Sequence, residues 1–386
     1  DGPLTLRGDA AAVARPRTHE PRAGALRDRR HDADVVRACG QALGKALARV
    51  AAARTVRGGP TRFCCPLDEA YTLATVDLTG PKTSDVKLEP YGIASSRKGG
   101  RRWVGTYRTA LTPKFWAAVS SGLGSVSLER RRGDNAHHVL ESSFKAFARC
   151  LRVALDGGPP PPPPKADTPR RAARTRATKE TTIEVRVDLD APYAKADAPG
   201  GPMAAWTGDA QTPTMLKASI KETPRLQTGL PLLDTVLDGF AKAANVAIVV
   251  RCVGDLHIDD HHSAEDVAIS LGQCLGEALG DKAGLRRMAW AERSIDGATV
   301  RAVLDLSNRP HVHSNLNLDE EYLGWDDRAT NDAPDPGPIG DAVGEALTCE
   351  MLAHAFESLA VEARCTLHLD ATRDSGAPGH TLPLAR

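Results

Sequence analysis

Residues 254–280 read "GDLHIDDHHSAEDVAISLGQCLGEALG", a stretch in which two adjacent histidines stand ahead of a glutamate at helical spacing. On a helix, residues i and i+4 share a face, so His261 and Glu265 can bind one cation. The ring of His262 projects about 100° away, towards a second cation or a neighbouring chain. Imidazole and carboxylate ligands without nearby thiolates suit Mn, Fe or Zn, and they argue against a structural zinc finger.

A second cluster, in "NAHHVLESSFKAFARCL" (135–151), repeats this spacing with His137, His138 and Glu141. One such pattern alone fits a polar, solvated helix face as well as it fits a metal site. Two copies of the pattern favour metal binding, and two such helices that face each other would make a di-metal site. The sequence therefore predicts metal-dependent chemistry.

The composition limits the classes of partner. The chain has 386 residues, with 50 Lys and Arg against 49 Asp and Glu, so no overall charge favours nucleic acid or an anionic membrane. No apolar run approaches the roughly 20 residues that span a bilayer. The eight cysteines form no CxxC pair, which is typical of reduced thiols in an intracellular compartment. Because the chain begins with Asp rather than Met, we expect any targeting segment to lie upstream.

A run of six consecutive prolines divides the chain. Such a run adopts an extended polyproline helix and acts as a semi-rigid spacer between folded units. A length of 386 residues also favours two domains over one. We therefore expect domains at 1–155 and 168–386, joined by a Pro-rich linker at 156–167.

The two domains repeat each other. The letters "CGQALGKALARV" (39–50) resemble "LGQCLGEALGDK" (271–282), and both show apolar residues at helical spacing. The strand-like "ATVDLTGP" (74–81) likewise resembles "AVLDLSNRP" (302–310). Residues 1–155 therefore read as another copy of the same module, entered partway through.

Several stretches together closely resemble imidazoleglycerol-phosphate dehydratase, an enzyme family of histidine biosynthesis. Besides the two clusters, these stretches are "TGLPLLDTVLD", "RATKETTIEV", "LDLSNRP", "TCEMLAHAFESLAVEARCTLHLD" and "CPLDEA". The resemblance covers most of 168–373 and most of 31–155. It implies an α+β fold of duplicated half-domains, each a four-stranded sheet packed against helices, here in two tandem copies. The family normally carries the two clusters in the opposite order, so the chain would start inside one copy and end inside the next.

The resemblance also implies a cofactor, partners and a location. In that family the enzyme binds two manganese ions per site and assembles into a 24-mer with active sites at subunit interfaces. We therefore expect Mn²⁺, imidazole glycerol phosphate as substrate and a large homo-oligomer, with no nucleic-acid or membrane partner. The expected compartment is the cytoplasm or a plastid.

The implied reaction is the dehydration of imidazole glycerol phosphate to imidazole acetol phosphate. The substrate loses a proton from one side-chain carbon and a hydroxyl from the neighbouring carbon. Divalent cations on both ring nitrogens would stabilise an imidazolate-like intermediate. A carboxylate is needed as base, and cationic side chains must hold the phosphate.

Positions that match the family's motifs then acquire implied roles. The implied metal ligands are His261, His262, Glu265, His368, His137, His138 and Glu141. The implied catalytic carboxylates are Glu180, Glu265 and Glu141. The implied phosphate-binding residues are Arg287, Arg309 and Lys145.

The two copies depart from the family pattern in opposite ways. In the second copy, Thr235 stands where the family has a ligand histidine, and Gly297 replaces the glutamate of the PLDEA motif. The place of its second cluster is taken by Pro378, Gly379 and Leu382. The first copy keeps the second cluster together with Asp68 and Glu69. The place of its first cluster is taken by Arg29, Arg30 and Ala33.

Three interpretations of these losses stay open. The copies can build composite sites, across the linker or between subunits, in which each supplies the cluster that the other lacks. The chain can be a fragment of a larger tandem enzyme. Both copies can be decayed, which leaves a catalytically inactive structural paralogue within a dehydratase assembly. Thr235 is the strongest indication of decay, because composite assembly does not restore its histidine.

Overall fold

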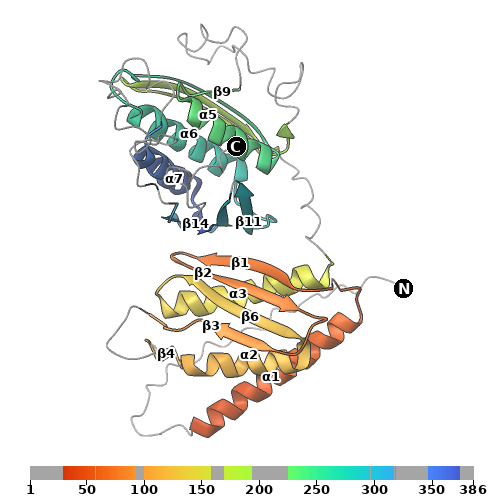
Figure 1. The fold of residues 1–386 in the computed structure, drawn as a ribbon. Coiled ribbons are helices and arrows are strands. Elements are labelled where there is room, and N and C mark those ends of the chain that lie inside the picture. The colour runs from red at the N-terminus through yellow and green to blue at the C-terminus, as the bar shows by residue number, and fades with distance from the viewer. Residues whose placement is uncertain are drawn as a thin grey trace, which may run out of the picture.

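The computed structural model describes residues 29–56, 58–92, 100–157, 169–193, 225–295, 297–316, 318 and 347–373. These residues form helices and three four-stranded sheets, with one further two-stranded sheet, so the predicted α+β class is confirmed (Figure 1). The predicted linker at 156–167 begins at the end of the described N-terminal part, and its six prolines, residues 159–164, lie outside the described residues. Within the described ranges, no helix is both long and apolar enough to cross a membrane.

The helices are α1 (Arg29–Ala52), η1 (Thr109–Leu111), α2 (Thr112–Leu123), α3 (Ala136–Leu155), α5 (Pro231–Ala244), α6 (His261–Leu279) and α7 (Cys349–Ala363). The strands of the N-terminal part, residues 29–157, are β1 (Thr61–Leu67), β2 (Ala70–Asp77), β3 (Ser84–Lys87), β4 (Trp103–Val104), β5 (Tyr107–Arg108) and β6 (Ser125–Arg132). The strands of the C-terminal part, residues 169–373, are β7 (Arg171–Ala177), β8 (Thr181–Asp188), β9 (Leu226–Gln227), β10 (Ala247–Gly254), β11 (Met288–Ile295), β12 (Ala298–Asp305), β13 (His311–Ser314) and β14 (Thr366–Arg373).

The three four-stranded sheets share one topology. Their strand orders are β1-β2-β6-β3, β7-β8-β10-β9 and β11-β12-β14-β13. In each sheet the first three strands of that order pair antiparallel, and the last strand joins in parallel. In each unit a helix (α2, α5 or α7) directly precedes the strand that comes last in the chain (β6, β10 or β14). In the first two units another helix (α3 or α6) follows that strand. The duplicated half-domains that the sequence predicted are therefore confirmed.

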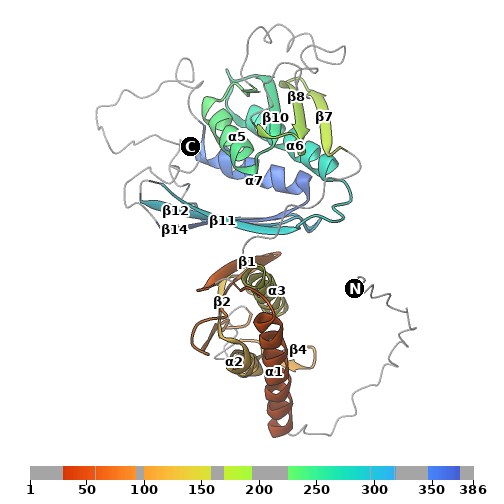
Figure 2. The same cartoon turned by 90° about the vertical axis from the view of Figure 1, so that its right-hand side faces the viewer.

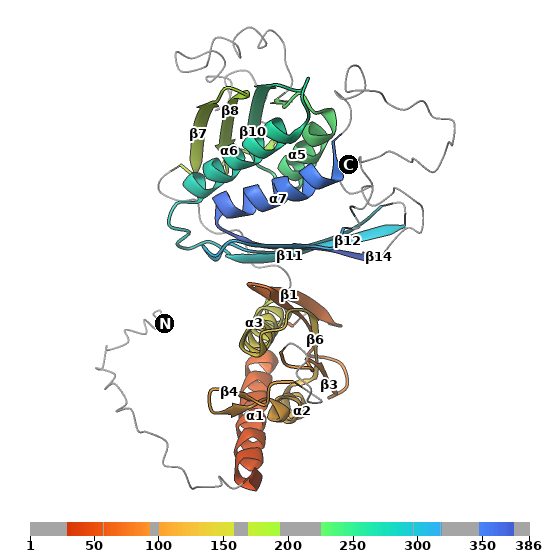
Figure 3. The same ribbon diagram turned by 90° about the vertical axis from the view of Figure 1, so that its left-hand side faces the viewer.

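In the C-terminal part, helices lie between two sheets (Figure 3). Strand β8 is rich in β-branched residues, and Ile183, Val185 and Val187 are fully buried on one of its faces. They form one core with Val267 and Leu271 of α6. Helix α6 also packs against α7.

The N-terminal and C-terminal parts meet through two sheets, a contact that we call the junction (Figure 2). Strand β1 packs against β11 and β12, and Tyr71 and Cys64 form a small buried cluster with Val303. The Tyr71 hydroxyl donates a hydrogen bond to Asp370, and Arg132 forms an ion pair with the same carboxylate. The junction therefore combines an apolar contact with buried polar pairs.

Helices α1 and α6 match in sequence but differ in their surroundings. Val267 of α6 is 1% exposed beneath β7 and β8, whereas its counterpart on α1, Val35, is 46% exposed. Leu43 and Val50 continue this exposed row at helical spacing, and the exposed Cys39 lies between Val35 and Leu43. We call these four residues the α1 stripe. Among the described residues, no sheet covers the stripe.

Candidate active site

Helices α6 and α7 begin at a shared carboxylate. Asp260, the residue before α6, accepts hydrogen bonds from the backbone N–H and the hydroxyl of Thr348, at 2.8 and 2.9 Å. Thr348 is the N-cap of α7, and its side-chain oxygen accepts the N–H of Met351. This link holds the first turns of the two helices together, and these turns carry the side chains of the first cluster.

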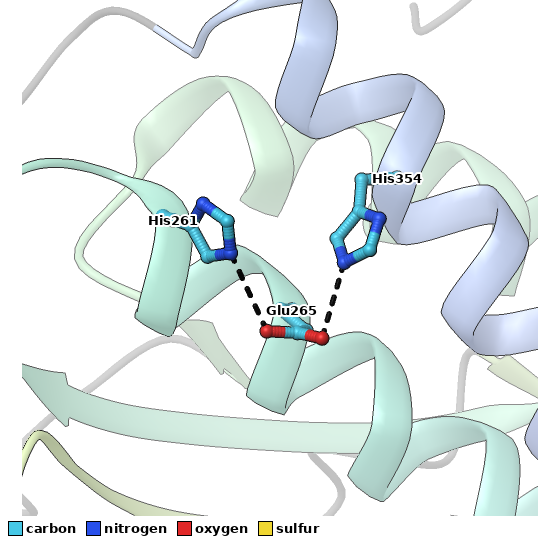
Figure 4. Close-up of side chains that lie close together, drawn as sticks. All are labelled: His261, Glu265 and His354. Carbon is cyan, nitrogen blue, oxygen red and sulfur yellow. Dashed lines mark hydrogen bonds and ion pairs between the residues drawn. The ribbon is translucent and has the colours of Figure 1, made fainter.

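In the structure, His354 of α7 joins His261 and Glu265 of the HHxxE motif, and these three residues make up the first cluster as it is folded (Figure 4). One carboxylate oxygen of Glu265 lies 3.5 Å from Nε2 of His261, and the other lies 3.1 Å from Nε2 of His354. Among the described residues, this is the group of His, Cys, Asp and Glu whose ligand atoms all lie within 4.8 Å of one another. Two imidazoles and one carboxylate, all partly open to solvent, fit Mn, Fe or Zn and leave room for further ligands.

The adjacent histidine points elsewhere, as its position on the helix predicted. Nδ1 of His262 lies 3.0 Å from Asp255, and this hydrogen bond raises the pKa of the imidazole. The charge of Glu180 adds to this effect, which places Glu180 near the same ring. Glu180 itself is exposed in the turn between β7 and β8. The start of α6 thus carries two separate imidazoles, each with carboxylates close by.

The second cluster lies at the start of α3. Asn135 caps this helix, and its side chain accepts the backbone N–H of His137. Nε2 of His137 lies 2.9 Å from Glu141, and Nζ of Lys145 lies 2.6 Å from the other oxygen of that carboxylate. Both neighbours lower the pKa of Glu141, with Lys145 contributing most. The i, i+4 geometry that the sequence predicted is therefore present in this cluster too.

His138 turns towards the loop between β1 and β2. Its Nδ1 lies 2.6 Å from Glu69, and its Nε2 lies 3.9 Å from Asp68. Burial tends to raise the pKa of Glu69, but the hydrogen bonds from His138 and from the backbone of Asn135 leave it lowered. Asp68 in turn pairs with Arg309 of the C-terminal part, at 3.0 Å. This chain of contacts connects the second cluster to the junction.

The three cationic residues implied for phosphate binding gather at the junction. Nε of Arg287 lies 2.6 Å from Asp305, a carboxylate that is 1% exposed. Burial raises the pKa of Asp305, while Arg287, Lys145 and Arg309 all act to lower it. Lys145 belongs to the N-terminal part and the two arginines to the C-terminal part. Cations from both parts of the chain therefore act on one buried carboxylate.

The two clusters do not meet within the described structure. The group formed by His261, Glu265 and His354 contains no residue of α3. His368, another implied ligand, lies on β14 and is fully buried on the face of its sheet that meets the junction. Helix α7 covers the opposite face of that sheet. The structure therefore does not bring His368 to the first cluster.

His354 is the site residue that sequence reasoning missed. It interrupts the apolar pattern of "MLAHAFESLAVEA" in α7, which is a weak signal because a lone histidine on a helix is often only exposed. Its role becomes visible only when α7 is placed beside α6. At Thr235, another implied ligand position, the hydroxyl donates a hydrogen bond to the carbonyl of Pro231 within α5. The positions Pro378, Gly379 and Leu382 lie outside the described residues.

Comparisons with known proteins agree with the family that the sequence motifs resemble. The sequence model of the imidazoleglycerol-phosphate dehydratase family matches residues 24–151 and 228–380, more than half of the chain. The chain is 38% identical over 207 residues to imidazoleglycerol-phosphate dehydratase of Pyricularia oryzae, an alignment that covers 53% of this chain and 80% of the relative. It is 36% identical over 204 residues to the enzyme of Trichoderma harzianum, covering 53% and 86%. The enzyme of Saccharomyces cerevisiae is 34% identical over 210 residues, covering 53% and 82%.

Two solved structures are also similar to this chain. Imidazoleglycerol-phosphate dehydratase of Staphylococcus aureus aligns with a TM-score of 0.36 and 20% identity, covering 55% of this chain and 88% of that one. The enzyme of Pyrococcus furiosus aligns with a TM-score of 0.33 and 22% identity, covering 52% and 80%. On the family match and the curated relatives, the chain belongs to the imidazoleglycerol-phosphate dehydratase family, the hydro-lyases of histidine biosynthesis.

Proposed function

We propose that this chain is a Mn²⁺-dependent imidazoleglycerol-phosphate dehydratase made of two tandem copies, residues 1–155 and 168–386. Its active site is divided between two half-sites. The α6–α7 half-site consists of His261, His262, Glu265, His354 and Glu180. The junction half-site consists of His137, His138, Glu141, Lys145, Arg287 and Arg309.

The observation that carries this proposal is the mixed origin of the junction half-site. Lys145 comes from α3, whereas Arg287 and Arg309 come from the C-terminal part, and all three act on the pKa of Asp305. The second metal cluster lies on the same helix as Lys145, one turn away. Neither copy alone supplies both the cluster and the arginines, so the junction supports a composite site.

Each cation of the junction half-site is paired with a carboxylate. Lys145 pairs with Glu141, Arg287 with Asp305 and Arg309 with Asp68. These pairs hold the long side chains in place before substrate arrives, which lowers the entropy cost of binding a phosphate. The phosphate then gains charge-assisted hydrogen bonds from the same donors.

The ligand sets of both half-sites fit Mn²⁺, which takes imidazole and carboxylate ligands. Bound there, the metal ions would supply the Lewis-acid stabilisation that the loss of the C–H proton requires. The chain's own residues orient the site and move the proton. Glu265 fixes the rings of His261 and His354. We assign the proton transfers to Glu180, an exposed carboxylate near His262, and to Glu141, a half-buried carboxylate of the second cluster.

Because the half-sites of one chain do not meet, the proposal requires a second chain. A large homo-oligomer, of the 24-subunit kind expected from the family, would bring the α6–α7 half-site of one chain to the junction half-site of another. The α1 stripe supports assembly, since four apolar or weakly polar side chains in a row stay exposed on the described chain. We place the enzyme in the cytoplasm or in a plastid.

A second candidate function is a catalytically inactive paralogue within a dehydratase assembly. The observation that favours it is Thr235, which stands at an implied ligand position and hydrogen-bonds the carbonyl of Pro231 instead. A hydroxyl bonded within its own helix cannot replace the imidazole. This candidate predicts a folded, assembled protein without turnover.

The test is Mn²⁺-dependent conversion of imidazole glycerol phosphate by the full chain, measured after chelation and again after Mn²⁺ is restored. A His138→Ala variant is run in parallel, with His257→Ala as the matched control because His257 is exposed. The proposal predicts activity that His138→Ala abolishes and His257→Ala leaves unchanged. A folded and assembled protein without activity would favour the inactive paralogue.

A further inference from the structure

Three histidines gather on the junction face of the β11-β12-β14-β13 sheet, outside both half-sites. His311 and His313 lie on β13, and His368 lies opposite His313 on the neighbouring strand β14. The intervening Val312 packs with the α7 side of the sheet, so the two β13 histidines point to the other side. All three imidazoles therefore share the face that meets the N-terminal part.

The His311 and His368 rings lie near the spacing of two ligands on one ion, and the His313 ring lies farther from His368. The centroid of the His368 ring lies 5.6 Å from that of His311 and 6.4 Å from that of His313. With Zn–N bonds of about 2.0–2.1 Å, two imidazoles on one tetrahedral zinc have centroids roughly 5 Å apart. The three histidines are looser than the group of His261, Glu265 and His354, whose ligand atoms all lie within 4.8 Å of one another, so the exposed His313 would have to turn inward to bind the ion.

His368 is prepared as a ligand by its own hydrogen bond. Its Nε2 lies 2.8 Å from the backbone carbonyl of Asp68, which accepts a hydrogen and so requires Nε2 to carry the proton. Nδ1 then presents a lone pair, and this atom of a fully buried side chain has no hydrogen-bond partner among the described residues. Metal-bound histidines usually donate a hydrogen bond from their other ring nitrogen to such a carbonyl, which fixes the tautomer.

The neighbouring ring shares this feature. Nε2 of His311 is also buried and, within the part of the chain that the structure describes, has no hydrogen-bond partner. Burial lowers the pKa of His311, and it lowers the pKa of His368 to about 3. Both rings are therefore neutral at physiological pH, so a cation need not displace a proton from them. An unpartnered lone pair in a buried site is costly, which is a reason for a bound ion to be there.

We propose that His311, His313 and His368 form a further metal site, distinct from the two half-sites, which takes Zn²⁺ or a similar imidazole-preferring cation. Three nitrogen ligands without a carboxylate suit zinc, copper or nickel better than manganese. The ion would join β13 to β14 beside the Asp68 carbonyl, and so stabilise the junction. His368 thereby belongs to this cluster rather than to the manganese site that the family resemblance implied.

The experiment is a Zn²⁺ titration of the chelator-treated full chain, with bound ions counted by competition with a chromophoric chelator. The tested variants are His313→Gln and the double change His311→Gln with His313→Gln. His257→Gln serves as the control, since it removes an exposed histidine away from the cluster. Because the exposed His313 is tolerant of change, circular dichroism should show a folded protein in each case.

The proposal predicts that the double variant binds one Zn²⁺ fewer per chain than the wild type, whereas His257→Gln binds the same number. Co²⁺ provides an independent signal, because tetrahedral cobalt absorbs visible light, and the double variant should lose one such component. An unchanged zinc count and an unchanged cobalt spectrum would overturn the proposal. Neither readout depends on turnover, so this result stands apart from the test of dehydratase activity.

Discussion

His354 and Glu265 come from different helices, yet their side chains lie 3.1 Å apart. The hydrogen bonds of Thr348 to Asp260 start both helices at one point, so the spacing is set by backbone and cap rather than by the two side chains alone. A ligand held in this way keeps its position when the ion is absent, which raises affinity by preorganisation.

Replacement of His354 by Ala should therefore weaken Mn²⁺ binding at the first cluster. The loss should exceed the roughly 10- to 100-fold that is typical when only an outer partner of a ligand is removed. Calorimetric titration of the chelated chain with Mn²⁺ measures it, and His257→Ala is the control. An affinity equal to that of the wild type would remove His354 from the metal site.

The i, i+4 spacing predicted both His–Glu pairs correctly, because that geometry is local to one helix. His354 could not be predicted in the same way. It contributes to the site through the packing of α7 on α6, and nothing in the sequence fixes which turns of the two helices meet. The same limit applies to His368, whose face of the sheet follows from the pairing of β13 with β14.

At the scale of elements, α1 and α6 allow a matched comparison. The backbone of α1 approaches α2 so closely at Gly44 that an added Cβ would overlap the carbonyl of Val119. At the corresponding Gly276 of α6, the nearest atom would be the carbonyl oxygen of Glu362, 3.2 Å away. The first contact is between backbones and cannot relax by turning a side chain.

Gly44→Ala should thus lower the free energy of unfolding by about 1–3 kcal/mol, the usual cost of overpacking, less the small gain in helix propensity. Gly276→Ala should change it by less. Urea unfolding followed by circular dichroism compares the two. Equal stability of the variants would contradict the close packing of α1 on α2.

A pH effect is expected at the start of α5. Burial raises the pKa of Asp234, although the backbone N–H of Thr228 donates to its carboxylate at 2.9 Å and opposes the shift. As the pH rises above about 3.9, the ordinary pKa of an aspartate, the folded protein keeps this proton to a higher pH than the unfolded chain does. The unfolded state is therefore stabilised relative to the folded state as the pH rises through that window, and the free energy of unfolding falls.

Asp234→Asn keeps an acceptor for the Thr228 N–H but cannot ionise. The variant should lose this part of the pH dependence, and at pH 7 it should be at least as stable as the wild type. Asp281→Asn is the control, since Asp281 also accepts a backbone N–H but is exposed. Thermal unfolding between pH 4 and 7 decides, and a steeper decline in Asp234→Asn would be contrary to this account.

The elements show which parts of the fold the sequence could predict. The repeat of "GQALGKAL" by "GQCLGEAL" predicted equivalent helices, and alternation predicted strands such as β2 and β12. The sequence did not indicate that the sheet carrying β12 would meet β1 and β2. That contact depends on the few side chains around Tyr71 and Val303, which carry no periodic signal.

At the scale of the whole molecule, the junction brings side chains of the N-terminal and C-terminal parts together. It places Lys145 of α3 within electrostatic reach of Asp305, the partner of Arg287. The first cluster remains separate from this group, on the other side of a sheet and helix layer. A single chain therefore carries both of the proposed ligand clusters but holds them in two places.

This arrangement gives a direct test of the divided active site. His354→Ala damages only the α6–α7 half-site, and His138→Ala damages only the junction half-site. Each variant alone should be inactive if both half-sites are required. In an assembly that contains both variants, some sites pair an intact α6–α7 half-site from one chain with an intact junction half-site from another.

The measurement is Mn²⁺-dependent dehydration of imidazole glycerol phosphate by the two variants, separately and after equal amounts have been dissociated and reassembled together. Random pairing between chains predicts recovery of about a quarter of wild-type activity in the mixture, from two inactive components. A mixture as inactive as its components, made from a wild-type chain that does turn over, would contradict the division of the site between chains.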